Sequence, residues 1–211
     1  LYGAITAMDE QIGRLRKLLK DLGKEENTII FFCSDNGPDD GLFRKGVASA
    51  GKLRGHKHQM YEGGIHVPSL MVWKGKLKEG SVCPERVGTV DYLPTILDLL
   101  DLPAINDRPI DGVSMVPVLA GKPASKRTYP LAAGFMRLYD DLETYSLIEG
   151  DYKICIPVKR GKLEMYNLKK DPYETTDIST KEPEIFNDLK EKLEAVKKSW
   201  LHSRDGGDYE W

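Results

Sequence analysis

The stretch "NTIIFFCSDNG", Asn27 to Gly37, joins a strongly apolar run to a group of short polar side chains. The run from Asn27 to Cys33 is β-branched and aromatic without alternation, which is typical of a strand covered on both faces. The segment before it predicts an amphipathic helix whose apolar residues recur at steps of three and four, with Gly23 as its stop. A helix followed by a fully buried strand indicates an α/β sheet.

Asp35 and Asn36 directly follow this strand. In open α/β sheets, ligands bind beyond the carboxyl ends of the strands. A carboxylate and an amide oxygen in succession suit Ca²⁺ or Mg²⁺, and Gly37 would let the backbone turn sharply to aim both side chains. The same residue types also form ordinary turns, so local chemistry alone favours a turn. We interpret Asp39 and Asp40 as loop residues.

Further elements follow this loop. Residues 38–64 are rich in Gly, Lys and His and show no clear period, as in a functional or mobile segment. "VPSLMVW", Val67 to Trp73, predicts the next buried strand. "VDYLPTILDLLDLP" predicts a helix with Asp91 as its N-cap and Pro94 in its first turn. These segments complete an α/β portion over residues 1–125.

The character of the sequence changes near Tyr129. "YSLIEGDYKICIPV" alternates around Gly150 and Asp151, which indicates a β-hairpin, and "KLEMYNL" predicts a third antiparallel strand. A terminal helix is expected from Glu182 to Leu201. Residues 126–211 are therefore predicted to form a small antiparallel sheet carrying a helix.

Composition narrows the class of protein. The chain has 211 residues with 31 basic and 33 acidic side chains, so its formal net charge of −2 argues against a nucleic-acid partner. Three cysteines without C-x-x-C spacing argue against a disulfide framework and against a zinc site. No apolar run is long enough to span a bilayer. Because the chain opens directly into a helical pattern, we expect its natural N-terminus to lie upstream.

A second cluster, "GKLRGHKHQMYEGGIHVP", concentrates positive charge among glycines. Such a loop beside a divalent cation is suited to holding a tetrahedral oxyanion. Solvated side chains are the plain alternative for most of its Lys and His residues.

Five ordered pieces of the chain resemble the formylglycine-dependent sulfatases, closest to the group of arylsulfatases and hexosamine 6-sulfatases. The pieces are "SDNG" (34–37), "LRGHKHQMYEGGIHVP" (53–68), "VDYLPTILDLL" (90–100), "DGVSMVPVLAG" (111–121) and "EMYNLKKDPYETTDIS" (164–179). The resemblance implies the C-terminal part of an alkaline-phosphatase-like α/β sheet with flanking helices, followed by the small antiparallel sheet and terminal helix.

The resemblance also implies roles for residues. Asp35 and Asn36 match two of the family's four protein ligands to Ca²⁺. Lys57, in K-x-x-x-Y-E-G-G, matches the lysine that contacts the substrate sulfate. Glu62 is expected to shape its loop. The implied activity is hydrolysis of sulfate esters of small molecules or glycans, with a periplasmic, secreted or lysosomal location.

One departure limits this expectation. The family's nucleophile is a formylglycine made within a C/S-x-P/A-x-R motif, and nothing here fits it: "CPER", Cys83 to Arg86, has its proline and arginine one residue early. The nucleophile and the other calcium ligands are expected in an absent N-terminal half. We therefore expect this chain alone to be inactive and to bind calcium weakly.

Two alternatives remain open. One is a phosphate or phosphonate ester hydrolase of the same superfamily, since tetrahedral oxyanions look alike to Ca²⁺ and lysine. The other is a non-catalytic carbohydrate-binding module. Candidate residues for reading the substrate are His56, His58, His66 and Arg137, and candidate sugar-stacking aromatics are Tyr139, Tyr145, Tyr152, Trp200, Tyr209 and Trp211.

Overall fold

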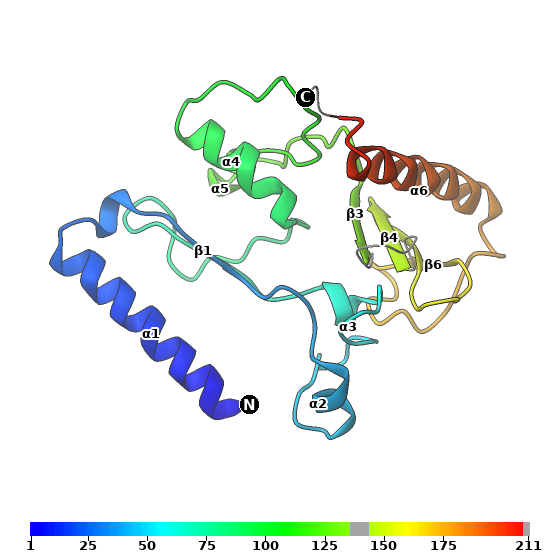
Figure 1. The fold of residues 1–211 in the computed structure, drawn as a ribbon, viewed down its shortest axis with the longest axis horizontal. Coiled ribbons are helices and arrows are strands. Elements are labelled where there is room, and N and C mark those ends of the chain that lie inside the picture. Colours follow the sequence, from blue (N-terminus) through cyan, green and yellow to red (C-terminus); the bar gives the residue numbers. More distant parts are fainter. Residues whose placement is uncertain (136–143, 209–211) are drawn as a thin grey trace.

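The computed structural model describes residues 1–135 and 144–208 (Figure 1). A long N-terminal helix stands beside a two-stranded ribbon, and a four-stranded sheet carries the last helix. In chain order the elements are α1 (Tyr2–Asp21), the 3₁₀ turn η1 (Glu25–Asn27), β1 (Ile30–Cys33), α2 (Asp40–Arg44), α3 (Glu62–Ile65), β2 (Ser69–Val72), the 3₁₀ turn η2 (Thr89–Asp91), α4 (Tyr92–Leu99), α5 (Val116–Leu119), β3 (Leu131–Phe135), β4 (Thr144–Glu149), β5 (Tyr152–Ile156), β6 (Glu164–Asn167) and α6 (Pro183–Arg204).

The first helix and strand form where the sequence predicts them. Helix α1 ends at Asp21, and Gly23 follows with a positive φ of 64°. Strand β1 pairs antiparallel with β2, from Ile30 opposite Val72 to Cys33 opposite Ser69. The predicted complete burial is wrong for both strands: all four residues of β1 are half-buried, and three of the four in β2 are exposed. Within the described residues the ribbon has two strands, and no residue of either strand is fully buried.

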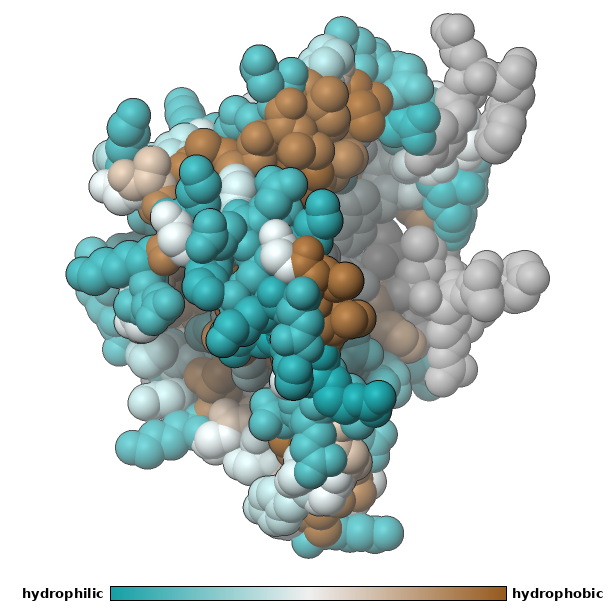
Figure 2. Space-filling view, turned by 90° about the vertical axis from the view of Figure 1, so that its left-hand side faces the viewer, coloured by the Kyte–Doolittle hydropathy of each residue, from teal (hydrophilic) through white to brown (hydrophobic). Residues whose placement is uncertain are grey.

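Apolar side chains remain exposed around this ribbon. Helix α1 has no buried residue, and Leu93 and Ile96 of α4, together with Leu100 just after it, are at least 36% exposed. Figure 2, which views the molecule from the end where α1, β1 and α4 lie, shows hydrophobic patches between polar side chains. The amphipathic pattern therefore predicts these helices correctly, while their apolar stripes are not covered by the described residues.

Asp91 has a role different from the predicted helix cap. It lies at the end of η2 with helical φ and ψ, and its carboxylate makes no cap to α4. The carboxylate instead accepts the N–H groups of Gly88 and Val113 at 2.8 and 2.9 Å. Both of its oxygens also pair with Arg127, at 2.8 and 2.6 Å. A fully buried carboxylate thus ties three loop segments together, while Pro94 lies in the first turn of α4 as predicted.

The C-terminal portion is an antiparallel sheet in the order β3-β4-β5-β6. The hairpin around Gly150 and Asp151 and the strand β6 are confirmed. The terminal helix is also confirmed, and extends to Arg204. Strand β3 was not predicted, because "LAAGF" has neither alternation nor β-branched residues.

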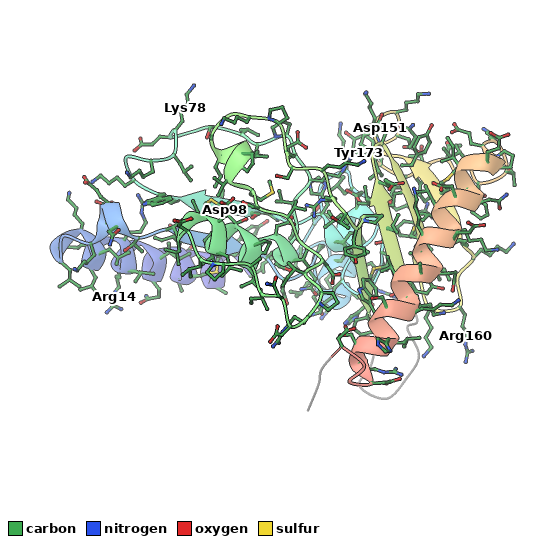
Figure 3. All side chains as sticks on the ribbon, turned by 90° about the horizontal axis from the view of Figure 1, so that it is seen from above. Arg14, Lys78, Asp98, Asp151, Arg160 and Tyr173 are labelled. Atoms are coloured by element: carbon green, nitrogen blue, oxygen red, sulfur yellow. The ribbon has the colours of Figure 1, made fainter. Side chains whose placement is uncertain are left out.

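The two faces of this sheet are covered by different parts of the chain. Side chains alternate between faces along a strand, so Ile154 points to one side while Lys153 and Cys155 point to the other. One face packs on α6 through a cluster made of Tyr145, Leu147, Ile154, Met165, Leu189 and Leu193. The other face packs on the segment before and within α3, through Met60, Tyr61, Cys155, Tyr166 and Leu168. Figure 3 shows the sheet from above, with α6 along one side.

We expect Asp91→Asn to lower the free energy of unfolding by about 3 kcal/mol, because it leaves Arg127 without its carboxylate partner. Burial alone would raise the pKa of Asp91, but the hydrogen bonds from Arg127, Gly88 and Val113 lower it below its ordinary value. The stabilisation is therefore present above about pH 4 and is lost as pH falls through the lowered pKa.

Urea denaturation at neutral pH and at about pH 3 measures both effects. Asp107→Asn is the control, since its ion pair with Arg108 is exposed and is expected to contribute less than about 1 kcal/mol. Equal losses for the two variants would contradict this role of Asp91.

Candidate functional site

The loop after β1 is held by hydrogen bonds within the loop and by one to the residue before β2. The Ser34 N–H continues the ribbon by donating to the Pro68 carbonyl at 3.1 Å, and the Ser34 hydroxyl donates to the Asn36 carbonyl at 3.0 Å. The Asn36 N–H donates to Oδ1 of Asp35 at 3.0 Å. Hydrogen bonding from Asn36, and more weakly the charge of Lys57, hold the pKa of exposed Asp35 below its ordinary value. Asp35 is therefore an ionised carboxylate at neutral pH.

The loop that carries Lys57, here called the Lys57 loop, lies directly against the loop after β1. The Gly37 N–H donates to the Gly64 carbonyl at 2.8 Å, and the Lys57 N–H donates to the Pro38 carbonyl at 2.9 Å. These two bonds join residues 27 and 19 positions apart in sequence and bring together the loops that carry the predicted sulfate and metal residues.

Glycine makes this approach possible. A Cβ on Gly37 would lie 1.9 Å from the Gly63 carbonyl oxygen, and a Cβ on Gly64 would lie 2.0 Å from that of Gln59. The chain bends at residues 35–37 as expected, although Gly37 has no positive φ. Its function in the fold is close backbone contact.

The segment predicted to be irregular contains two short helices. Asp39 caps α2 by accepting the N–H groups of Gly41 and Leu42. Asp40 in the first turn pairs with Arg44 at 2.6 Å and with His56 Nε2 at 3.2 Å. The interpretation as loop residues is therefore wrong for Asp40, which begins α2, while Asp39 caps this helix from the loop.

The histidine candidates lie around Lys57. His56 Nδ1 is 3.0 Å from the Lys57 carbonyl oxygen, so both of its ring nitrogens face acceptors. His58 has a positive φ of 71°, and its ring contacts that of Phe135 in β3 at a centroid distance of 4.8 Å and a tilt of 51°. His66 Nδ1 lies 3.1 Å from Glu62 Oε2. Arg137 lies outside the described residues.

Glu62 is buried and paired with a buried lysine. Lys153 Nζ lies 2.8 Å from Glu62 Oε1 and 2.8 Å from Glu174 Oε1, and Lys153 has no exposed surface. Burial alone would raise the pKa of Glu62, but the His66 hydrogen bond and the Lys153 charge lower it to about 2. The hydrogen bond with Glu62 in turn raises the pKa of His66. Glu62 thus shapes the loop as expected.

Two residues of this arrangement were missed in the sequence. Lys153 stands between apolar residues in "YKICI", and the fourth residue of "DPYE" is Glu174. Lys153 could have been found in the sequence as a lysine within an otherwise buried strand, since lysine is almost never fully buried without a partner. The identity of that partner depends on residues far away in sequence, at Glu62 and Glu174.

The oxygen donors at Asp35 and Asn36 fit a hard cation. An ionised carboxylate beside an amide side chain is the donor chemistry that Ca²⁺ prefers. Across residues 1–135 and 144–208 no group of three or more His, Cys, Asp or Glu is arranged to hold a metal ion. These two residues supply a minority of the six to eight or so oxygens that calcium takes.

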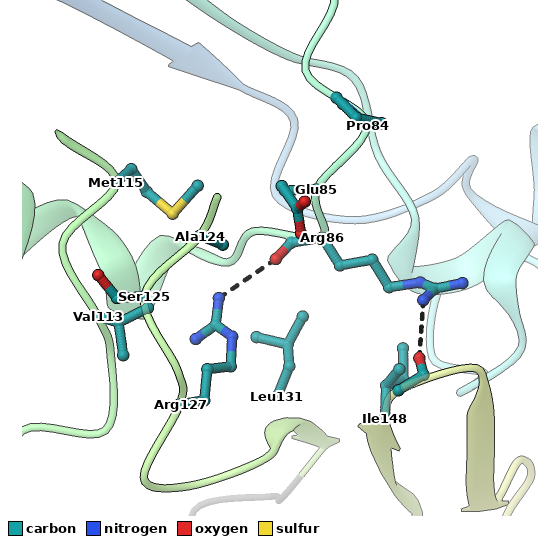
Figure 4. Close-up of a pocket in the computed structure, with 11 residues that line it drawn as sticks. Pro84, Glu85, Arg86, Val113, Met115, Ala124, Ser125, Arg127, Leu131 and Ile148 are labelled. Atoms are coloured by element: carbon teal, nitrogen blue, oxygen red, sulfur yellow. Dashed lines mark hydrogen bonds between the residues drawn. The ribbon is translucent and has the colours of Figure 1, made fainter. Parts of the chain in front are cut away.

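A separate cavity of about 240 Å³ shares no lining residue with these loops. It lies between the segments near Arg86 and Arg127 and the strands β3 and β4 (Figure 4). The guanidinium of Arg127 is paired with Asp91 and donates to the Arg86 carbonyl, while that of Arg86 donates to the Gly150 carbonyl. Both arginines therefore hold neighbouring segments of the chain together through these hydrogen bonds.

Packing accounts for three of the six aromatic residues considered for sugar stacking. Tyr145, Tyr152 and Trp200 pack in the cluster between the sheet and α6. The remaining three, Tyr139, Tyr209 and Trp211, lie outside the described residues. No helix in the described part of the chain combines the length and the apolar character needed to cross a membrane.

Comparisons with known proteins find two family models. The model described as "Sulfatase" matches residues 1–102, and "N-sulphoglucosamine sulphohydrolase, C-terminal" matches residues 55–199. An arylsulfatase of Clostridium perfringens is 30% identical over 97% of this chain. The chain spans 39% of that protein, and therefore less than half of its length.

Solved structures share the fold. The structure of BT4656 in complex with its substrate D-glucosamine-2-N,6-O-disulfate matches 93% of this chain and 39% of its own, with a TM-score of 0.70 and 26% identity. The phosphonate monoester hydrolase of Agrobacterium radiobacter matches 94% of this chain and 40% of its own, with a TM-score of 0.66. Its 23% identity supports likeness of fold alone.

We expect Gly37→Ala to lower the free energy of unfolding by about 3 kcal/mol, because its Cβ would overlap the main chain of the Lys57 loop. Gly13→Ala in α1 is the matched control. It has open space around it and should stabilise the chain by up to about 1 kcal/mol. Denaturant unfolding compares the two, and a Gly37→Ala chain as stable as the unchanged one would rule out the close contact.

Proposed function

The chain belongs to the sulfatase family, and we propose that it is the C-terminal part of an enzyme that hydrolyses sulfate esters. The proposed substrate class is a sulfated small molecule or glycan. The nucleophile and the remaining metal ligands are proposed to come from a part of the protein outside this chain.

One observation carries the proposal. Two main-chain hydrogen bonds, Gly37 N–H to Gly64 C=O and Lys57 N–H to Pro38 C=O, place a cationic loop against a loop with two hard oxygen donors. The charge of Lys57 is close enough to Asp35 to contribute to its lowered pKa. An ammonium group beside a cation site is an arrangement that can bind a tetrahedral dianion or monoanion at several oxygens.

The proposed roles follow from charge and donor type. Asp35 and Asn36 would hold Ca²⁺ through side-chain oxygens, and the bound cation supplies electrophilic stabilisation of sulfate oxygens. Lys57 would donate hydrogen bonds to the sulfate and neutralise charge that develops on it and on the departing oxygen. Asp35 would remain ionised in this role because hydrogen bonding and the Lys57 charge lower its pKa.

In the whole protein we expect Lys57→Met to lower kcat/KM for an aryl sulfate by about 100-fold or more, because a donor to the developing charge is lost. Lys52→Met is the control, since Lys52 is an exposed lysine five residues earlier. Steady-state kinetics with an aryl sulfate and the matching aryl phosphate measures the effect. Unchanged sulfate hydrolysis in the Lys57 variant, or faster hydrolysis of the phosphate by the unchanged protein, would contradict the proposal.

We also expect that this chain alone does not hydrolyse sulfate esters and binds calcium weakly. Asp35 and Asn36 are a minority of the ligands that calcium takes, and the 211 residues contain no C/S-x-P/A-x-R motif. Calorimetric titration with Ca²⁺ and an assay with an aryl sulfate test both points. Turnover by a pure sample that disappears on Lys57→Met would show that this chain is sufficient.

A further inference from the structure

Glu174 has an unusual backbone for its position. It is fully buried, yet its φ is +55°, in the left-handed region that side chains with a Cβ disfavour. A residue keeps such a conformation when its surroundings hold it there, and these positions gather at functional sites. The contacts of Glu174 show what holds it.

Glu174 contacts both ends of one loop segment. Its Oε2 accepts the N–H of Glu62 at 2.6 Å, and its main-chain oxygen accepts a hydrogen bond from Arg54 Nη1 at 2.8 Å. Lys57 lies between Arg54 and Glu62 in sequence, so a single residue of the C-terminal portion holds the start and the end of the segment that carries Lys57. Charge-assisted hydrogen bonds of this kind are among the stronger ones.

The segment is also closed on itself. The Gly63 N–H donates to the Arg54 carbonyl at 2.6 Å, and the Arg54 guanidinium lies 3.9 Å from the centre of the Tyr61 ring. The Met60 N–H donates to the Pro157 carbonyl at 2.9 Å, a further bond to the C-terminal portion. With both ends fixed, the residues between them have little freedom to shift.

Lys153 completes the contact. Its ammonium lies between Glu174 and Glu62, so it holds the two carboxylates that would otherwise repel each other. On its other side the same loop bonds to the metal-ligand loop through Lys57 and Gly64. The loop is therefore fixed between the antiparallel sheet and the loop of Asp35.

We propose that Glu174, with Lys153, is a positioning residue that clamps the Arg54–Glu62 segment and so sets the place of the Lys57 ammonium relative to Asp35 and Asn36. The link to catalysis rests on the proposed function of Lys57; the clamp itself does not. The C-terminal portion of the chain thereby takes part in the site through Lys153 and Glu174.

Glu174→Gly tests the clamp in the whole protein. Glycine suits the positive φ, so the variant removes the carboxylate without adding backbone strain. The matched control is Arg160→Gly, an exposed residue with a φ of +58°. Glu174→Gln, which keeps an oxygen acceptor for the Glu62 N–H but removes the charge facing Lys153, is the conservative variant.

Hydrogen exchange gives a readout independent of sulfate chemistry. In Glu174→Gly we expect exchange at the Lys57, Glu62 and Gly63 amides to rise about tenfold or more, with the β4–β5 hairpin unchanged. Arg160→Gly should leave these amides unchanged. No local rise in the Glu174 variant, or an equal rise in the control, would overturn the clamp.

Kinetics then tests positioning. We expect kcat/KM for an aryl sulfate to fall about 100-fold in Glu174→Gly, as for a misplaced catalytic group, with a smaller fall in Glu174→Gln. Leu193→Ala, a change in the core on the α6 face, should have little effect at equal folded fraction. Faster amide exchange in Glu174→Gly with the same kcat/KM as the protein without substitutions would overturn the positioning role. If the protein without substitutions has no sulfatase activity, only the proposed function is refuted.

Discussion

The ammonium group of Lys153 is the constraint on which the site depends. It is fully buried, and burial alone would lower its pKa, yet the charges of Glu62 and Glu174 raise it. A buried charge is tolerated only when its partners are close and themselves hydrogen-bonded. The loop that carries Glu62 and the turn that carries Glu174 together supply the charged partners that Lys153 needs within the folded sheet.

This requirement connects the two portions that the sequence suggests. The proposed division near residue 125 follows the change from helices and loops to an antiparallel sheet, but Glu62 precedes it and Lys153 and Glu174 follow it. One face of the sheet packs on α6, and the other packs on Met60 and Tyr61 beside the Lys57 loop. The candidate site is thus supported from both portions.

The sequence predicted local structure where a periodic pattern was strong. Helix α1, the hairpin of β4 and β5, and α6 were all found this way, because their patterns repeat over many residues. Prediction from the sequence failed where the burial of a strand or the partner of a side chain depends on distant parts of the chain. The apolar run of β1 predicts a strand but cannot report that its residues are only half-buried, and Asp91 reads as a helix cap although its partner is Arg127.

The sequence by itself determined the candidate residues Asp35, Asn36 and Lys57, through residue chemistry and ordered resemblance to one family. Only the tertiary structure decided how they are held together. The contacts responsible are main-chain hydrogen bonds across glycines and the ion pair of Glu62 with Lys153, which are 91 residues apart. Neither leaves a periodic pattern in the chain, because each depends on distance in space rather than on spacing in sequence.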